Sequence, residues 1–126
     1  MDREKADECG EVLKFAEKGD ITAIITVFSL HSIAVILEDL ESVEKYRIFL
    51  ETIGNFNGLY IHSLTTGEEI KACKDTDIQK LNFDDSYQYR TAKNLNINLI
   101  TLDEDFEDTD IETFTPGEVV KIENKS

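Results

Sequence analysis

The sequence has few of the residues that break or cross-link a chain: one proline, six glycines and two cysteines among 126 residues. Cys9 and Cys73 lie far apart and form no CxxC pair, so their spacing indicates neither a disulfide framework nor a zinc site. Apolar runs are short as well, and none reaches the roughly 20 residues that a membrane-spanning helix needs. With 40% hydrophobic and 32% charged residues, the chain is too apolar to be disordered. These features predict one globular domain over residues 1–126.

Basic residues are scarce relative to acidic ones. Thirteen Lys and Arg stand against 27 Asp and Glu, which gives a formal charge of −14. A broad basic face for nucleic acid is therefore disfavoured, because such binding comes from neutralising phosphates. A metal ion that bridges acidic groups to phosphate remains compatible with this charge. The N-terminal stretch is charged from its second residue and does not resemble a secretory signal, so we expect a soluble, cytoplasmic protein with no membrane association.

Hydrophobic periodicity predicts helices that alternate with β-branched strands. Helices are expected over the first 18 residues, as one long helix from Ile33 to Ile53, from Thr66 to about Lys74, over Asp84 to Asn94, and after Pro116. Strands are expected over Ile21 to Val27, Leu59 to Ser63, Asn98 to Leu102 and Glu112 to Phe114. This order predicts an α/β fold with a mostly parallel central sheet of about four strands and helices on both faces.

Acidic residues lie on both sides of the third expected strand. Asp103 and Asp105 directly follow it, and Asp84 and Asp85 open the helix that precedes it. Parallel sheets place ligands outside the carboxyl ends of their strands. Carboxylates that converge there suit Mg²⁺ or Mn²⁺, and such an ion can polarise phosphate and supply hydroxide. The common nucleotide-binding loops, GxxxxGK[ST] and GxGxxG, are absent.

Simpler interpretations exist for the same residues. Asp84 and Asp85 can serve the start of a helix through capping and the helix dipole. The seven acids among residues 103–112 can form a solvated loop. Tyr87 and Tyr89, with Arg90 and Lys93 beyond them, could stack a base and meet phosphate, but the favoured interpretation is that the tyrosines are packed and the cations are solvated.

The segment LNFDDSYQYRTAKNLNINLITLDEDF, Leu81 to Phe106, resembles the C-terminal half of a PIN domain. The shared pattern is a helix-opening Asp in a context like FDDA, a helix, a strand and then T-x-D-x-D-F. The closing Thr115 to Glu118 is similar to the family's terminal TP-x-E turn. The resemblance implies a three-layer PIN-like fold and a metal-dependent ribonuclease, as in the toxin ribonucleases of type II toxin-antitoxin systems.

PIN nucleases use about four acidic residues around one or two Mg²⁺ or Mn²⁺ ions. By position, the resemblance implies Asp85 and Asp103 as catalytic residues and metal ligands, with Asp105 as a further metal ligand. A third family acid, a Glu early in the long helix, corresponds to Ser32 here. The fourth lies in an N-terminal strand of the form apolar-D-[TS]. This chain begins inside the helix that follows that strand, and Asp2 does not replace the missing acid.

Two functions from different classes follow from this comparison. The first is a metal-dependent endoribonuclease with an incomplete acidic site and weak or no activity, which binds Mg²⁺ or Mn²⁺ weakly. The alternative is a non-catalytic PIN-like interaction or RNA-binding module. A receiver-like phosphoacceptor domain fits less well, because residues 27–30 offer no acid after the first expected strand. The expected partners are RNA, an antitoxin-like protein and a second copy of the chain.

Overall fold

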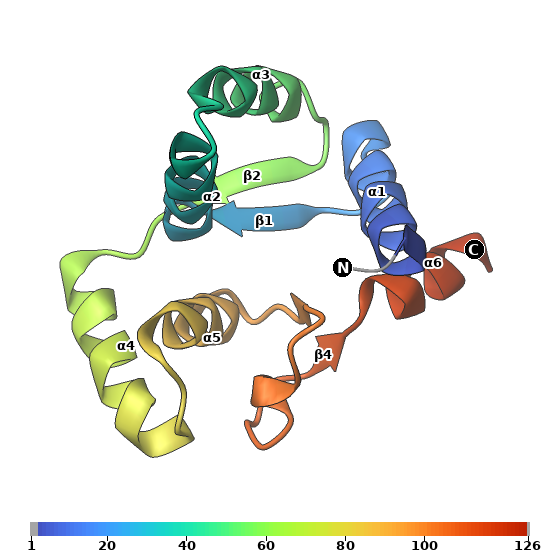
Figure 1. Ribbon diagram of the computed structural model, residues 1–126. Coiled ribbons are helices and arrows are strands. Elements are labelled where there is room, and N and C mark those ends of the chain that lie inside the picture. Colours follow the sequence, from blue (N-terminus) through green and yellow to red (C-terminus); the bar gives the residue numbers. More distant parts are fainter. Residues whose placement is uncertain (1–2, 126) are drawn as a thin grey trace. The chain divides into compact units, whose positions relative to one another are not determined.

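The computed structural model describes residues 3–125, which contain six α-helices, one 3₁₀ turn and four strands (Figure 1). The helices are α1 (Arg3–Lys18), α2 (Val27–Asp39), α3 (Val43–Ile53), α4 (Thr66–Gln79), α5 (Phe83–Leu95) and α6 (Pro116–Asn124). The strands are β1 (Ala23–Thr26), β2 (Leu59–His62), β3 (Leu99–Ile100) and β4 (Thr113–Phe114), and the 3₁₀ turn is η1 (Glu104–Phe106). No helix in this part of the chain is both long and apolar enough to span a bilayer.

All four strands pair in parallel, which confirms the predicted α/β class. β1 pairs with β2 from Ala23 opposite Leu59 to Thr26 opposite His62. β3 pairs with β4 through Leu99 opposite Thr113 and the next residue of each strand. The strands therefore form two small sheets of two strands each. The chain accordingly divides into two compact units, a β1–β2 unit of residues 13–63 and a β3–β4 unit of residues 3–12 and 64–125.

In the β1–β2 unit, β1 runs directly into α2 at Thr26. The Thr26 hydroxyl accepts a hydrogen bond from the Ser29 backbone N–H at 3.1 Å, which caps the helix. Gly58, just before β2, lies so close to the chain before β1 that its N–H donates to the Ala16 carbonyl at 2.8 Å. A Cβ at this position would come within 2.1 Å of the Ile21 carbonyl oxygen. The close approach of the two segments therefore requires glycine here.

The predicted long helix from Ile33 to Ile53 is wrong in one respect, because the structure divides it into α2 and α3. The break lies at Leu40–Ser42, where Glu41 adopts a left-handed conformation with φ of 54°. The helical spacing of Ile33, Ile36, Leu37, Leu40 and Leu50 predicts one buried apolar stripe. In the structure, Ile36 and Leu40 are largely exposed. The three other residues of that apolar stripe, Ile33, Leu37 and Leu50, are half-buried.

In the β3–β4 unit, α4 and α5 pack side by side (Figure 1). α4 begins with a capping box in which the Thr65 hydroxyl accepts from the Glu68 N–H and the Glu68 carboxylate accepts from the Thr65 N–H. Tyr87 of α5 is buried, and its hydroxyl accepts a hydrogen bond from the Leu64 N–H at 2.9 Å. This bond ties α5 to the segment that enters α4.

A second contact area of α5 faces the chain around η1. Leu81, Tyr89 and Phe106 form a buried apolar cluster, against which Leu99 and Ile111 also pack. These residues come from the segment just before α5, the middle of α5, β3, η1 and the approach to β4. The cluster therefore joins α5 to both strands and to the acidic segment between them.

Candidate metal site

Three carboxylates meet in the β3–β4 unit. Asp85 of α5 and Asp103 and Asp105, which follow β3, each offer one oxygen, and these oxygens all lie within 4.8 Å of one another. No other group of three or more His, Cys, Asp or Glu within residues 3–125 is arranged in this way. The convergence expected from the sequence is thus present, while the role of each carboxylate in metal binding or catalysis stays a prediction.

The beginning of α5 fixes the position of Asp85. Asn82 caps the helix, and its side-chain oxygen accepts from the Asp85 N–H at 3.2 Å. The Asp84 carboxylate accepts from the same N–H at 2.9 Å. Asp84 therefore serves the helix start, as its simpler interpretation proposed. The Asp85 carboxyl group is free of this task and faces the other two acids.

The turn after β3 fixes the other two carboxylates. The Asp103 N–H donates to the Thr101 hydroxyl at 3.0 Å, and the Asp103 carboxylate accepts from the Asp105 N–H at 2.9 Å. The second bond caps η1 and folds the chain back, so that residues 103 and 105 both present their side chains to Asp85. Asp103 and Asp105 are exposed, whereas Asp85 is half-buried.

Uncompensated negative charge marks this cluster. Burial, together with the charges of Asp84, Asp103 and Asp105 and a hydrogen bond with Asp105, raises the pKa of Asp85 to about 6. A divalent cation between the three groups would replace this repulsion by attraction. Mg²⁺ and Mn²⁺ prefer carboxylate oxygens, so the donor set fits such an ion.

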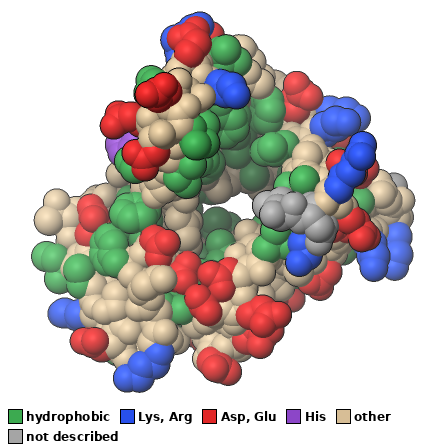
Figure 2. All heavy atoms as spheres, viewed as in Figure 1, with side chains coloured by type: hydrophobic (Ala, Val, Ile, Leu, Met, Phe, Trp, Pro, Cys, Tyr) green, Lys and Arg blue, Asp and Glu red, His purple; other side chains and the backbone are tan. Residues whose placement is uncertain are grey.

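Acidic side chains also gather on the surface around this cluster. Figure 2 shows them over the segment that contains η1, below the centre of the view. Phosphate groups would be repelled from such a surface in the absence of a cation. An anionic substrate at this site therefore needs a bound metal ion or a basic group that a partner protein supplies.

The structure decides between the alternatives for the tyrosines and cations of α5. Tyr87 and Tyr89 are each only 3% exposed, so they are packed and do not offer a ring for stacking a base. Arg90 pairs with Asp75, and Lys93 pairs with Asp110. The sequence interpretation assigned these cations to solvent and missed their partners. For Lys93, the sequence held one signal. Residues 85, 89 and 93 are spaced four apart, which places them on one face of a helix.

Ser32, the counterpart of a family glutamate, lies in α2 of the β1–β2 unit. Its hydroxyl is exposed and donates to the Phe28 carbonyl at 3.0 Å, one turn earlier in the helix. The side chain therefore carries no charge and already has a backbone partner. This position of the chain therefore has a neutral hydroxyl group and no carboxylate.

Comparison with known proteins identifies one family. A family model described as PIN domain matches residues 4–112, a span that includes Asp85, Asp103 and Asp105. No curated protein and no solved structure matches the chain.

Proposed function

The chain belongs to the PIN domain family, whose members are generally nucleases, and from this premise we propose that it is a Mg²⁺- or Mn²⁺-dependent endoribonuclease with an incomplete acidic site and weak or no activity. We take residues 1–126 as one PIN-like domain that includes both compact units. The observation that carries the proposal is the convergence of three carboxylates from the start of α5 and the end of β3.

Each carboxylate has a distinct part in this proposal. Asp85 and Asp103 would hold the ion and are the proposed catalytic residues, and Asp105 would complete the set of ligands. A divalent ion bound there would polarise a phosphate group and lower the pKa of a water molecule. The turn capped by Asp103 keeps the oxygens of residues 103 and 105 at ligand spacing before an ion arrives.

Two features make this site weak. Ser32 is neutral where the family has a glutamate, so fewer negative ligands are available to offset the reluctance of Mg²⁺ to lose water. Asp85, with its pKa near 6, is partly protonated just below neutral pH, and a ligand must be deprotonated to bind. Slow or absent RNA cleavage follows from both features.

The alternative, a non-catalytic PIN-like module that binds RNA or a protein in the cytoplasm, has its own supporting observation. Large apolar side chains are exposed around the turn between α2 and α3, namely Val35, Ile36, Leu40 and Val43. Exposed apolar groups of this kind favour a protein partner, either an antitoxin-like protein or a second copy of the chain.

Mn²⁺ calorimetry beside a ribonuclease assay tests the proposal. The variants are Asp85→Asn and, as a matched control, Asp84→Asn, which removes the same charge from the adjacent position. We expect weak Mn²⁺ binding that Asp85→Asn abolishes and Asp84→Asn retains, with slow or no cleavage of a structured and a single-stranded RNA. Equal binding by both variants would contradict the site. Tight binding with fast, Asp85-dependent cleavage would show that the acidic set is complete after all.

A further inference from the structure

One face of α5 contacts the acidic segment along its whole length. Asp85, Tyr89 and Lys93 are spaced four residues apart, so they lie one above the other on the helix. Asp85 meets Asp103 and Asp105, and the two residues above it both reach Asp110. The segment from 103 to 110 therefore follows this face from one end to the other.

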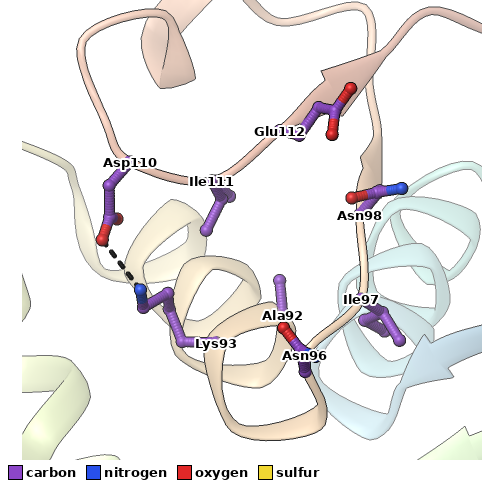
Figure 3. A pocket seen from close by; sticks show the side chains of 8 residues that line it. All are labelled: Ala92, Lys93, Asn96, Ile97, Asn98, Asp110, Ile111 and Glu112. Carbon is purple, nitrogen blue, oxygen red and sulfur yellow. Dashed lines mark hydrogen bonds and ion pairs between the residues drawn. The ribbon is translucent and has the colours of Figure 1, made fainter.

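Asp110 accepts a hydrogen bond on each of its carboxylate oxygens. The Tyr89 hydroxyl donates to Oδ1 at 2.6 Å, and the Lys93 ammonium donates to Oδ2 at 2.7 Å. Figure 3 shows the second bond, which spans from α5 to the segment before β4 at the edge of a cavity. The two donors come from adjacent turns of one helix, so the carboxylate is held from two directions. We call this arrangement of Tyr89, Asp110 and Lys93 the clasp.

The protonation states of these groups favour both hydrogen bonds of the clasp near neutral pH. Burial and the bond to Asp110 raise the pKa of Tyr89 to about 12, so its hydroxyl keeps the proton that it donates. Lys93 and then Tyr89 hold the pKa of Asp110 below its usual value, so this carboxylate stays charged. Hydrogen bonds to a charged acceptor are among the stronger ones in proteins.

Electrostatic repulsion acts against the contact between this segment and α5. The six acidic residues of the 103–110 segment repel one another and repel Asp85, and Asp103 and Asp105 are exposed. The buried ring of Phe106, packed against Tyr89, anchors the middle of the segment, and Asp110 anchors its end. Tyr89 thus takes part in both anchors.

We propose that Tyr89, Asp110 and Lys93 are positioning residues that hold the 103–110 segment on α5, so that Asp103 and Asp105 stay opposite Asp85 for a divalent ion. This inference rests on the proposed function for its final step. The clasp itself depends only on the geometry of the chain without metal. The clasp and its effect on metal binding can therefore be measured separately.

The test compares Tyr89→Phe with Tyr87→Phe. Both variants lose one hydroxyl from a buried tyrosine of α5 and keep the ring in place, and neither changes the charge. The two residues lie about 200° apart around the helix, and the Tyr87 hydroxyl accepts a hydrogen bond from the Leu64 N–H. Asp110→Ala and Asp110→Asn form a second series, in which Asn retains an oxygen that can accept from Tyr89.

Two readouts are used on the full chain. The first is amide hydrogen exchange in EDTA at Asp105, Glu107 and Thr109, whose N–H groups donate within the segment. The second is Mn²⁺ affinity by calorimetry on variants shown to be folded. We expect Tyr89→Phe to speed this exchange and to weaken Mn²⁺ binding, each by about threefold to tenfold, the effect of one lost hydrogen bond. Asp110→Ala should act likewise, Asp110→Asn less, and Tyr87→Phe should change neither readout.

Each failure has a separate meaning. Unchanged exchange in Tyr89→Phe and Asp110→Ala would overturn the clasp. Faster exchange with unchanged Mn²⁺ affinity would overturn the positioning role. A wild-type chain that binds no Mn²⁺ would overturn the proposed function, and the exchange data in EDTA would still decide the clasp.

Discussion

Arg90 of α5 holds the Asp75 carboxylate of α4 through two hydrogen bonds, from Nε to Oδ2 at 2.8 Å and from Nη2 to Oδ1 at 2.9 Å. The two side chains are only 13% and 7% exposed, so little water screens the pair. The bond to Asp75 also raises the pKa of Arg90 above its usual value. This pair joins the two long helices of the β3–β4 unit and so helps to fix the helix that carries Asp85.

We therefore expect Asp75→Ala to destabilise the protein by about 3 kcal/mol, because it leaves the Arg90 charge buried without its partner. Urea denaturation at pH 7 measures the loss. Glu44→Ala is the control, since Glu44 also pairs with an arginine, Arg47, but on the exposed surface of α3. The control should leave the midpoint almost unchanged, and equal losses in the two variants would contradict the structural role of the buried pair.

Gly58→Ala should destabilise the chain by about 2 kcal/mol or more, through strain in the backbone. The reason is the 2.1 Å approach of an added Cβ to the Ile21 carbonyl oxygen, which only a shift of the chain could relieve. Thermal unfolding measures the effect. Gly10→Ala is the matched control, because Gly10 lies inside α1 with nothing within 4 Å of its Cβ position. We expect that variant to be slightly stabilised by the better helix propensity of alanine.

The sequence predicted the order and type of the elements well but missed the break between α2 and α3. The apolar spacing continues through residues 40–42, because a three-residue interruption is close to one helical turn and preserves the phase of the stripe. No glycine or proline marks the break, and Glu41 takes the left-handed conformation in their place. Periodicity alone could not distinguish one helix from two.

For the candidate site, the sequence predicted which acids converge because each is tied to the end of an element. Asp85 follows the start of a helix, and Asp103 follows a strand. The clasp could not be predicted in the same way, because Asp110 lies 21 residues from Tyr89 within a stretch of seven similar acids. Only the folded chain shows which of them meets the phenol.

Asp85→Asn should stabilise the metal-free protein at pH 7. The pKa of Asp85 is raised to about 6 from an ordinary value near 3.8, so the folded state binds this proton more tightly than the unfolded state. Stability is therefore lost as the pH rises through 6, and the Asn variant avoids that loss. Solvent screening of this half-exposed group limits the gain to about 1 kcal/mol.

Urea denaturation in EDTA at pH 4 and pH 7 measures this difference between Asp85→Asn and the wild type. The gain should be present at pH 7 and shrink toward pH 4, where the wild-type carboxyl is protonated in the folded state. A gain that is equal at both pH values would show that the effect does not come from the titration of Asp85.

Mn²⁺ affinity should fall as the pH drops below about 6, because the ion must then displace a proton from Asp85. The limiting slope is about tenfold in affinity for each pH unit if one proton is released. Calorimetry from pH 5 to pH 8 in buffers of different ionisation enthalpy measures both the affinity and the number of protons. Affinity that stays constant down to pH 5 would exclude Asp85 as a ligand.

The most direct test of the account is an NMR titration of the ¹⁵N-labelled chain with small amounts of Mn²⁺, whose unpaired electrons broaden nearby amide signals. With a formal charge of −14, the protein offers many places for loose binding, so the location of the ion is the decisive observation. We predict that the amides of Asp85, Asp103 and Asp105 broaden first, and that Asp85→Asn removes this preference. Broadening that begins elsewhere, or that spreads evenly over the acidic residues, would contradict a metal site at these three carboxylates.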